Sequence, residues 1–280
     1  MNARTWQLAR ECWHLPPGGA VMGILNVTPD SFSDGGVHAD VASALSHARH
    51  MIEAGADIID IGGESTRPGS AEVPVAEEIC RVLPVIKALR AEFPVVRLSI
   101  DTRHAEVARA ALLAGVDVVN DITGLADPVM REVCAGFSCG VVIMHMQGEP
   151  ATMQLNPQYT DVVYEVRSFF QSRMDLAAYA GIDRRSVCLD PGIGFGKTTQ
   201  HNLSLIRELG RLRIGVQPML MALSRKRFMG ALLGNFELPV KSPLPTVVMS
   251  LLAAEHGADI HRVHDVAELK QALTLRASLF

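Results

Sequence analysis

The chain has 280 residues, 48% of them hydrophobic, which is enough for one large domain around a single core. Its formal net charge of -4 and pI near 6.2 argue against a nucleic-acid or anionic-membrane surface, because such surfaces require a basic excess. Five cysteines without a CxxC pair indicate neither disulfides nor a thiolate zinc site, and no window reaches the roughly 18 apolar residues of a membrane helix, so we expect a cytoplasmic protein acting on small molecules.

Residues 1–20 carry two tryptophans and are expected to form a hairpin or cap over the bottom of the same domain. Eight short, β-branched apolar runs follow, as is typical of strands buried on both faces. They are Val21–Leu25, Ile58–Ile61, Val95–Ile100, Val116–Val119, Gly140–Met144, Val187–Leu189, Met219–Leu223 and Ile260–Val263. Segments with helical apolar spacing alternate with them: Val41–Ala54, Val75–Ala91, Ala105–Ala114, Asp127–Ala135, Asp161–Ala180, Asn202–Leu209, Pro245–His256 and Val266–Leu279. This alternation predicts an α/β fold, a single (β/α)₈ TIM barrel over residues 21–280.

Two long loops rich in turn-forming residues follow the first two strands. Residues 26–36 read NVTPDSFSDGG, which we interpret as a mobile active-site loop, the alternative being an ordinary surface loop. Asn26 could supply a neutral oxygen to magnesium, an ion that prefers oxygen ligands and keeps several waters. Residues 62–69 read GGESTRPG, where amides, hydroxyls and a guanidinium could close over an anion. The alternative there is a glycine turn with solvated charges.

Three hydrogen-bonding side chains, Asp101, Asn120 and Asp190, come from the ends of the third, fourth and sixth strands. Two carboxylates in a barrel pit are costly unless a cation or a ligand rich in donors neutralises them. A pterin supplies such donors along its amino-pyrimidine edge. A helix N-cap is the alternative role for Asp101.

The segment DPGIGFGKT, residues 190–198, invites comparison with a phosphate-binding P-loop. The comparison fails because Pro191 occupies the position of the first glycine in GxxxxGK[ST] and an acidic residue begins the loop. We interpret Asp190 as the functional group and the glycines as positions where the backbone passes close to a ligand.

Basic residues follow the seventh and eighth strands, in SRKR (224–227) and RVHD (262–265), and are expected to place positive charge across the opening from Asp101 and Asp190. The corresponding loops of TIM barrels commonly hold phosphate, and strand alternation places Arg262 and His264 on one face. A solvated basic turn is the alternative for residues 225–227. We interpret His145, at the end of the fifth strand, as a hydrogen-bonded core histidine.

Taken together, these segments resemble the dihydropteroate synthases, folate-pathway enzymes that sulfonamides inhibit. The resemblance covers nearly the whole chain from Val21 onward and rests on eight ordered motifs. They are GILNVTPDSFSDGG (23–36), GGESTRPG (62–69), SIDT (99–102), VNDI (119–122), MHMQG (144–148), LDPGIGFGK (189–197), SRK (224–226) and RVHDV (262–266).

The resemblance implies a homodimeric barrel that joins 6-hydroxymethyl-7,8-dihydropterin diphosphate to 4-aminobenzoate, giving 7,8-dihydropteroate and pyrophosphate. It implies a catalytic set of Asp101, Asp190, Lys226 and Arg262. The same four residues, with Asn120 and Met144, would bind the pterin. Asn26, Thr66, Arg262 and His264 would bind the diphosphate, with Asn26 next to Mg²⁺. Phe32, Thr66, Arg67, Pro68, Phe195 and Arg227 would bind aminobenzoate.

The expected chemistry needs no side-chain nucleophile. Magnesium, Arg262 and His264 would neutralise the departing pyrophosphate, while Asp101 and Asp190 would offset the positive charge left on the pterin. These charges favour a dissociative route through a pterin cation.

One position departs from the family pattern. Many members carry serine after the SRK lysine, where this chain has Arg227, which would either contact the aminobenzoate carboxylate or turn to solvent. Two other functions compete with synthase activity. A corrinoid-linked methyltransferase domain would share the pterin pit but has no charged leaving group to bind, and a non-catalytic homologue would bind pterin without converting it.

Overall fold

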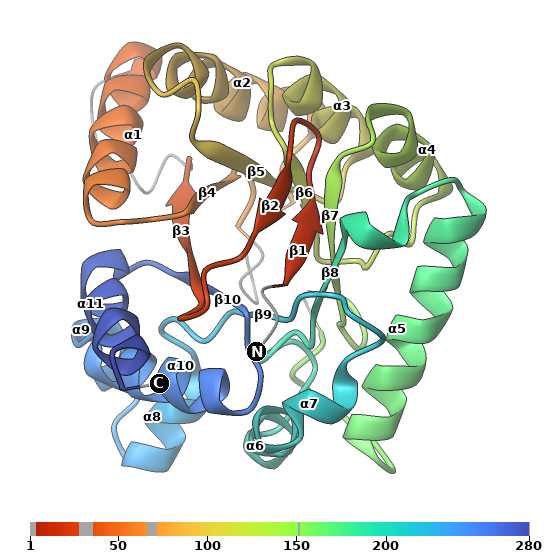
Figure 1. Ribbon diagram of the computed structural model, residues 1–280, viewed down its shortest axis with the longest axis vertical. Coiled ribbons are helices and arrows are strands. Elements are labelled where there is room, and N and C mark those ends of the chain that lie inside the picture. The colour runs from red at the N-terminus through yellow and green to blue at the C-terminus, as the bar shows by residue number, and fades with distance from the viewer. Residues whose placement is uncertain (1–3, 28–35, 66–71, 151, 280) are drawn as a thin grey trace.

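A computed structural model describes residues 4–27, 36–65, 72–150 and 152–279 (Figure 1). Eight parallel strands form its central sheet in the order β8-β7-β6-β5-β4-β3-β10-β9, and a bridge between Leu189 and Met219 brings the two ends of the sheet together. The predicted TIM barrel is thereby confirmed. The strands are β3 (Ala20–Asn26), β4 (Ile58–Gly62), β5 (Arg97–Asp101), β6 (Val118–Asp121), β7 (Gly140–Met144), β8 (Val187–Asp190), β9 (Leu220–Met221) and β10 (Ile260–Val263).

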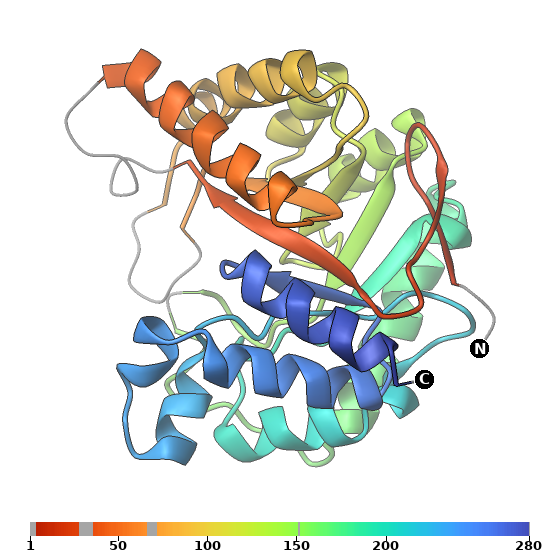
Figure 2. The same cartoon turned by 60° about the vertical axis from the view of Figure 1, so that its left-hand side comes forward.

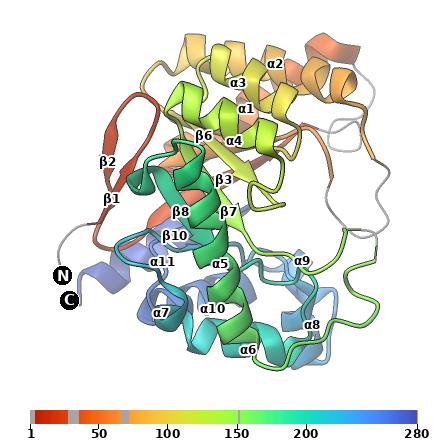
Figure 3. The same ribbon diagram turned by 90° about the vertical axis from the view of Figure 1, so that its right-hand side faces the viewer.

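Helices surround the barrel and cover the outward face of its strands (Figures 1 and 3). Those of at least seven residues are α1 (Gly36–Glu53), α2 (Val75–Glu92), α3 (Ala105–Leu113), α4 (Pro128–Phe137), α5 (Val162–Tyr179), α6 (Thr199–Arg207), α8 (Arg227–Leu233), α10 (Leu244–Glu255) and α11 (Val266–Ala277). The sequence prediction missed α8 and the shorter α7 (Leu209–Leu212), α9 (Leu238–Lys241) and 3₁₀ turn Arg184–Ser186, because elements this short show little apolar periodicity. In the part of the chain described, no helix is long and apolar enough to span a bilayer.

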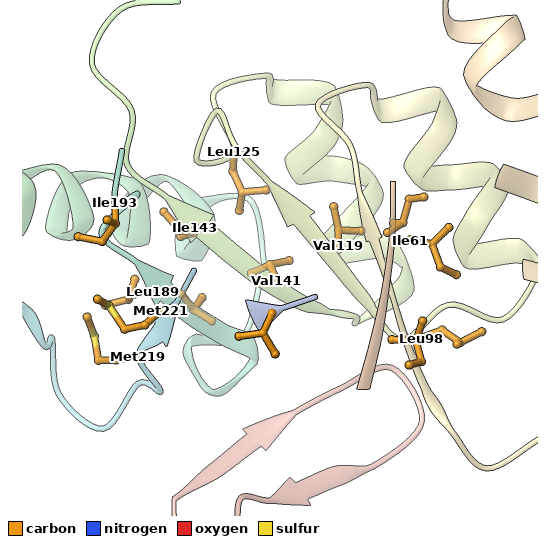
Figure 4. Close-up of a cluster of buried hydrophobic side chains, with 14 of the residues drawn as sticks. Ile61, Leu98, Val119, Leu125, Val141, Ile143, Leu189, Ile193, Met219 and Met221 are labelled. Atoms are coloured by element: carbon orange, nitrogen blue, oxygen red, sulfur yellow. The ribbon is translucent and has the colours of Figure 1, made fainter. Parts of the chain in front are cut away.

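Strand residues alternate between two apolar clusters because successive side chains point to opposite faces. Outward residues such as Ile61, Val119 and Ile143 belong to the large cluster between sheet and helices (Figure 4). Inward residues such as Ile58, Val118 and Val142 belong to a smaller cluster. Because both faces of these strands pack against apolar side chains, the strand sequences are continuous apolar runs.

An antiparallel hairpin, β1 (Thr5–Gln7) with β2 (Cys12–His14), lies at the amino ends of the strands (Figure 2). Trp6 is fully buried within the inward-facing cluster, and its Nε1–H donates to the Ser186 carbonyl at 2.7 Å. Trp13 packs on Trp6 with ring centroids 6.3 Å apart. The hairpin thus covers the amino end of the barrel, and polar groups gather at the other end.

Candidate active site

The register of neighbouring strands brings four predicted positions into one row. Asn26 pairs with Gly62, Gly62 with Asp101, and Asp101 with Asn120. Gly62 leaves room between its neighbours, since a Cβ there would lie 3.8 Å from Asn26 Oδ1 and 3.9 Å from Asp101 Oδ2. The two oxygens therefore face the same small space at the carboxyl end of the barrel.

Asp190 on β8 extends this row into a ring of polar side chains at the barrel mouth, and it is paired in register with Met144. It is buried, and its Oδ1 accepts the Gly192 N–H at 2.7 Å. Burial raises the pKa of Asp190, while the Gly192 amide and the ammonium of Lys226 oppose that rise.

Arg262 joins the ring from β10 and forms direct ion pairs with two carboxylates. Its Nε lies 2.5 Å from Asp60 Oδ2 and its Nη2 lies 2.6 Å from Asp101 Oδ2. The sequence led us to expect this arginine across the opening from the carboxylates. It instead forms an ion pair with Asp101, because closure of the barrel makes β10 a neighbour of β3 and brings its inward side chain within reach of β4 and β5.

Asp60 is the residue that sequence reasoning missed. It is completely buried on β4, and its Oδ2 also accepts the Asn120 amide at 3.1 Å. Its Oδ1 has no hydrogen-bond partner among the described residues. A charged residue inside an otherwise apolar strand was the available signal, since burying an unpaired carboxylate is costly.

The charges in this ring perturb one another. Burial raises the pKa of Asp101 to about 7, and Arg262 opposes the rise. Burial lowers the pKa of Lys226 to about 8 although Asp190 favours its charged form. Burial also disfavours the charged form of Arg262, but Asp60 and Asp101 outweigh it, so the net direction for the arginine pKa is upward. The ring therefore mixes a permanent cation with groups that titrate near neutrality.

The side chains of Lys226 and Phe195 contact each other at the edge of this ring of polar residues. The Lys226 Nζ lies 4.4 Å from the centre of the Phe195 ring, a cation–π contact. Phe195 belongs to the glycine-rich loop after β8, so this contact links the loops after β8 and β9. An aromatic face and an ammonium group are thus presented together.

Ser224 connects the basic segments after β9 and β10. Its Oγ lies 2.9 Å from His264 Nδ1 and accepts the His264 backbone N–H at 3.2 Å. Arg225 is paired with Asp265 at 2.9 Å. Arg227 is exposed, with its guanidinium carbon 5.9 Å from the ring centre of Phe236.

A second group of metal-ligand side chains lies behind the row, where Glu64, Glu78 and His104 have ligand atoms within 4.8 Å of one another. Arg103 already binds both Glu64 oxygens, at 3.0 and 3.1 Å, and His104 Nδ1 lies 2.6 Å from Glu78 Oε2. These pairs use both Glu64 oxygens and Glu78 Oε2, while Glu78 Oε1 has no hydrogen-bond partner among the described residues. Asn26, where magnesium is expected, is not part of this group. Four residues expected in the aminobenzoate or diphosphate sites lie outside the described residues: Phe32, Thr66, Arg67 and Pro68.

Comparison with known proteins identifies the family to which this sequence is similar. A family model described as pterin binding enzyme matches residues 22–264. The dihydropteroate synthase of Escherichia coli K12 is 46% identical over 253 residues, covering 90% of this chain and 89% of that protein.

Solved structures agree with this match. The structure of Xanthomonas albilineans dihydropteroate synthase with 4-aminobenzoic acid has a TM-score of 0.91 and 45% identity, covering 99% of this chain and 98% of that one. The Burkholderia cenocepacia enzyme complexed with 7,8-dihydropteroate has a TM-score of 0.89 and 40% identity, with coverage of 99% and 96%.

Proposed function

This chain belongs to the dihydropteroate synthase family of pterin-binding enzymes, and from that premise we propose how its barrel mouth performs the reaction. The site condenses 6-hydroxymethyl-7,8-dihydropterin diphosphate with 4-aminobenzoate to give 7,8-dihydropteroate and pyrophosphate. The observation that carries the proposal is Arg262 held by Asp60 and Asp101 in a ring that also contains Asn120, Asp190 and Lys226. All five cysteines are free, which fits a reducing cytoplasm.

The pterin binds to the buried polar side chains at the barrel mouth. Asp190 and Asp101 accept hydrogen bonds from its amino-pyrimidine edge, and Asn120 can both donate and accept. Lys226 reaches the polar edge of the pterin, Arg262 stacks on its face, and Met144 packs beside it. Because burial disfavours the charged forms of both aspartates, a donor-rich ring stabilises them.

The diphosphate lies towards Asn26, Arg262 and His264, with Thr66 from outside the described residues. The Asn26 amide oxygen beside the Asp101 carboxylate is an oxygen-only donor set, which fits Mg²⁺ together with phosphate oxygens and waters. When bound, the ion supplies charge neutralisation for the departing pyrophosphate. Arg262 supplies a fixed positive charge on the same side, because its two carboxylate partners orient it before substrate arrives.

Bond breaking leaves positive charge on the pterin, and Asp101 and Asp190 offset it. This arrangement favours a dissociative step followed by attack of the weakly basic aromatic amine. The Asp101→Asn variant tests the step: it keeps the shape and some hydrogen bonding but loses the charge, so kcat falls. Normal kcat with altered affinity alone would remove the charge-stabilising role.

Aminobenzoate packs on Phe195, with Phe32, Thr66, Arg67 and Pro68 completing its pocket by resemblance to the family. Its amine then approaches the pterin from the side of Phe195. The half-buried Phe195 ring beside Lys226 supports this placement, since an aromatic acid gains from both an apolar face and a nearby cation.

A homodimer completes the proposal. Helices α8 to α10 and the segments joining them carry a set of exposed large apolar side chains: Leu232, Leu233, Phe236, Leu238, Val240, Leu244, Val248 and Leu252. An apolar patch of this kind marks an association surface, and a second copy can cover it by two-fold symmetry. Sedimentation equilibrium should give the dimer mass for the wild type, and the Val248→Glu variant should shift it towards the monomer.

The direct test of the reaction uses purified protein with the pterin diphosphate, aminobenzoate and magnesium, assayed for pyrophosphate and dihydropteroate. Product that requires all three supports the proposal. Pterin binding without product would favour a non-catalytic homologue, and methyl transfer from methyltetrahydrofolate would favour the methyltransferase alternative.

A further inference from the structure

The glycine-rich loop after β8 is shaped by contact with neighbouring loops. Gly192, Gly194 and Gly196 all have positive φ, at 66°, 82° and 61°. A Cβ on Gly192 would lie 1.9 Å from the His145 carbonyl oxygen, and one on Gly196 would lie 2.4 Å from the Gln147 oxygen. The loops after β7 and β8 therefore approach each other more closely than any side chain at these positions would permit.

Lys197 lies at the centre of this contact and is 3% exposed. Its Nζ donates to the Phe195 carbonyl at 2.9 Å and to the His145 carbonyl at 3.2 Å, and lies 2.9 Å from His145 Nδ1. These three partners match the three hydrogens of the ammonium form, and burial lowers the pKa of Lys197 to about 7, so this form titrates near neutrality. The lysine thus joins the two loops through their backbones instead of extending into the opening.

His145 is suited to accept the third of these hydrogen bonds. Burial, reinforced by the charge of Lys197, lowers the His145 pKa to about 3, so the ring is neutral and its Nδ1 can accept. The ring also packs edge-on against Phe169, with centroids 4.9 Å apart. Tyr159 adds a hydrogen bond from its hydroxyl to the Gly196 carbonyl at 2.9 Å. These contacts hold His145, the partner of Lys197 in the loop after β7, in a fixed position.

The contact between Lys197 and the loop after β8 connects this lysine to the active site. Lys197 holds the carbonyl of Phe195, and the Phe195 ring lies against the ammonium group of Lys226. On the basis of the proposed function, we infer that Lys197 is a positioning residue that fixes Phe195 for binding of the aromatic amine substrate. Lys197 itself touches no substrate in this scheme.

The test is a double-mutant cycle with Lys197→Met and Phe195→Leu, measured by steady-state kinetics with both substrates varied. Lys197→Met should raise KM for 4-aminobenzoate by about tenfold, which corresponds to about 1.4 kcal/mol, and should change the dissociation constant of the pterin diphosphate much less. If the lysine acts through Phe195, the double variant should have nearly the same KM as Phe195→Leu alone.

Lys270→Met is the control, because Lys270 is likewise a paired lysine, half-buried and bound to Asp57 at 2.9 Å outside the site. It should leave both substrate constants unchanged. Lys197→Gln keeps an uncharged donor group and should give an intermediate KM. Additive effects in the cycle, equal weakening of both substrates, or loss of folding in both Lys197 variants would overturn the inference in favour of a purely structural role. A wild-type enzyme that forms no dihydropteroate would refute the proposed function instead.

Discussion

Replacing Asp60 with asparagine would test whether a completely buried carboxylate controls the site through Arg262. Asp60→Asn keeps the shape and one oxygen acceptor but removes the charge that holds Arg262 Nε at 2.5 Å. A hydrogen bond to a charged group contributes about 1.5–3 kcal/mol, and about 1.4 kcal/mol corresponds to a factor of ten. We therefore expect kcat/KM for the pterin diphosphate to fall by about 10- to 100-fold.

The pH profile gives a second, independent signature of the same change. Asp60 is one of the charges that raise the Asp101 pKa, which lies at about 7. If ionised Asp101 is the active form, kcat/KM rises with pH through that value, because this ratio reports the free enzyme. Removing the Asp60 charge lowers the Asp101 pKa, so the acidic limb should move to lower pH.

The matched control is Asp57→Asn, which removes a carboxylate just before the same strand. Asp57 accepts from the Val21 N–H at 2.8 Å and pairs with Lys270, away from the ring. It should reduce stability while leaving the acidic limb in place. A wild-type rate and an unmoved limb in Asp60→Asn would refute the reasoning.

Three further variants test separate parts of the structure. Burial lowers the pKa of His261 to about 4 from the ordinary 6.5, so the free energy of unfolding should fall by about 3 kcal/mol as pH falls from 6.5 to 4 and the buried ring must be protonated. In urea unfolding, His261→Leu should show a smaller fall in this free energy over the same pH range. An identical fall in the variant and the wild type would contradict this. Gly192→Ala should lower the melting temperature sharply because its Cβ meets the His145 oxygen, whereas Gly136→Ala, with nothing within 4 Å, should not; equal melting temperatures would argue against the tight loop contact. Arg227→Ser should leave KM for aminobenzoate unchanged because Arg227 is exposed, and a raised KM would indicate a direct contact with the carboxylate.

The sequence predicted the barrel and much of its mouth for a physical reason. Parallel strands all deliver their carboxyl ends to one side, so polar residues after successive apolar runs must converge. Asn26, Asp101 and Asn120 are examples, since the strand register places them in one row.

Asp60 and Lys197 escaped prediction because their partners are not local. Asp60 is bound by Arg262, which is 202 residues away along the chain, and looks like an isolated charge within an apolar strand. Lys197 resembles the lysine of a failed phosphate-loop pattern, while its contacts to the loop after β7 depend on the close approach of two backbones. Only the closed barrel brings these pairs together.

The hairpin that covers the amino end of the barrel has a kinetic consequence. Trp6 and Trp13 belong to the inward-facing apolar cluster that fills the barrel interior, and the hairpin lies at the amino ends of the strands (Figure 2), so substrates reach the site from the carboxyl ends. With the pterin diphosphate deepest in the proposed site, aminobenzoate bound above it would block its exit. The filled interior and the β1–β2 hairpin therefore predict ordered binding, with the pterin diphosphate before aminobenzoate.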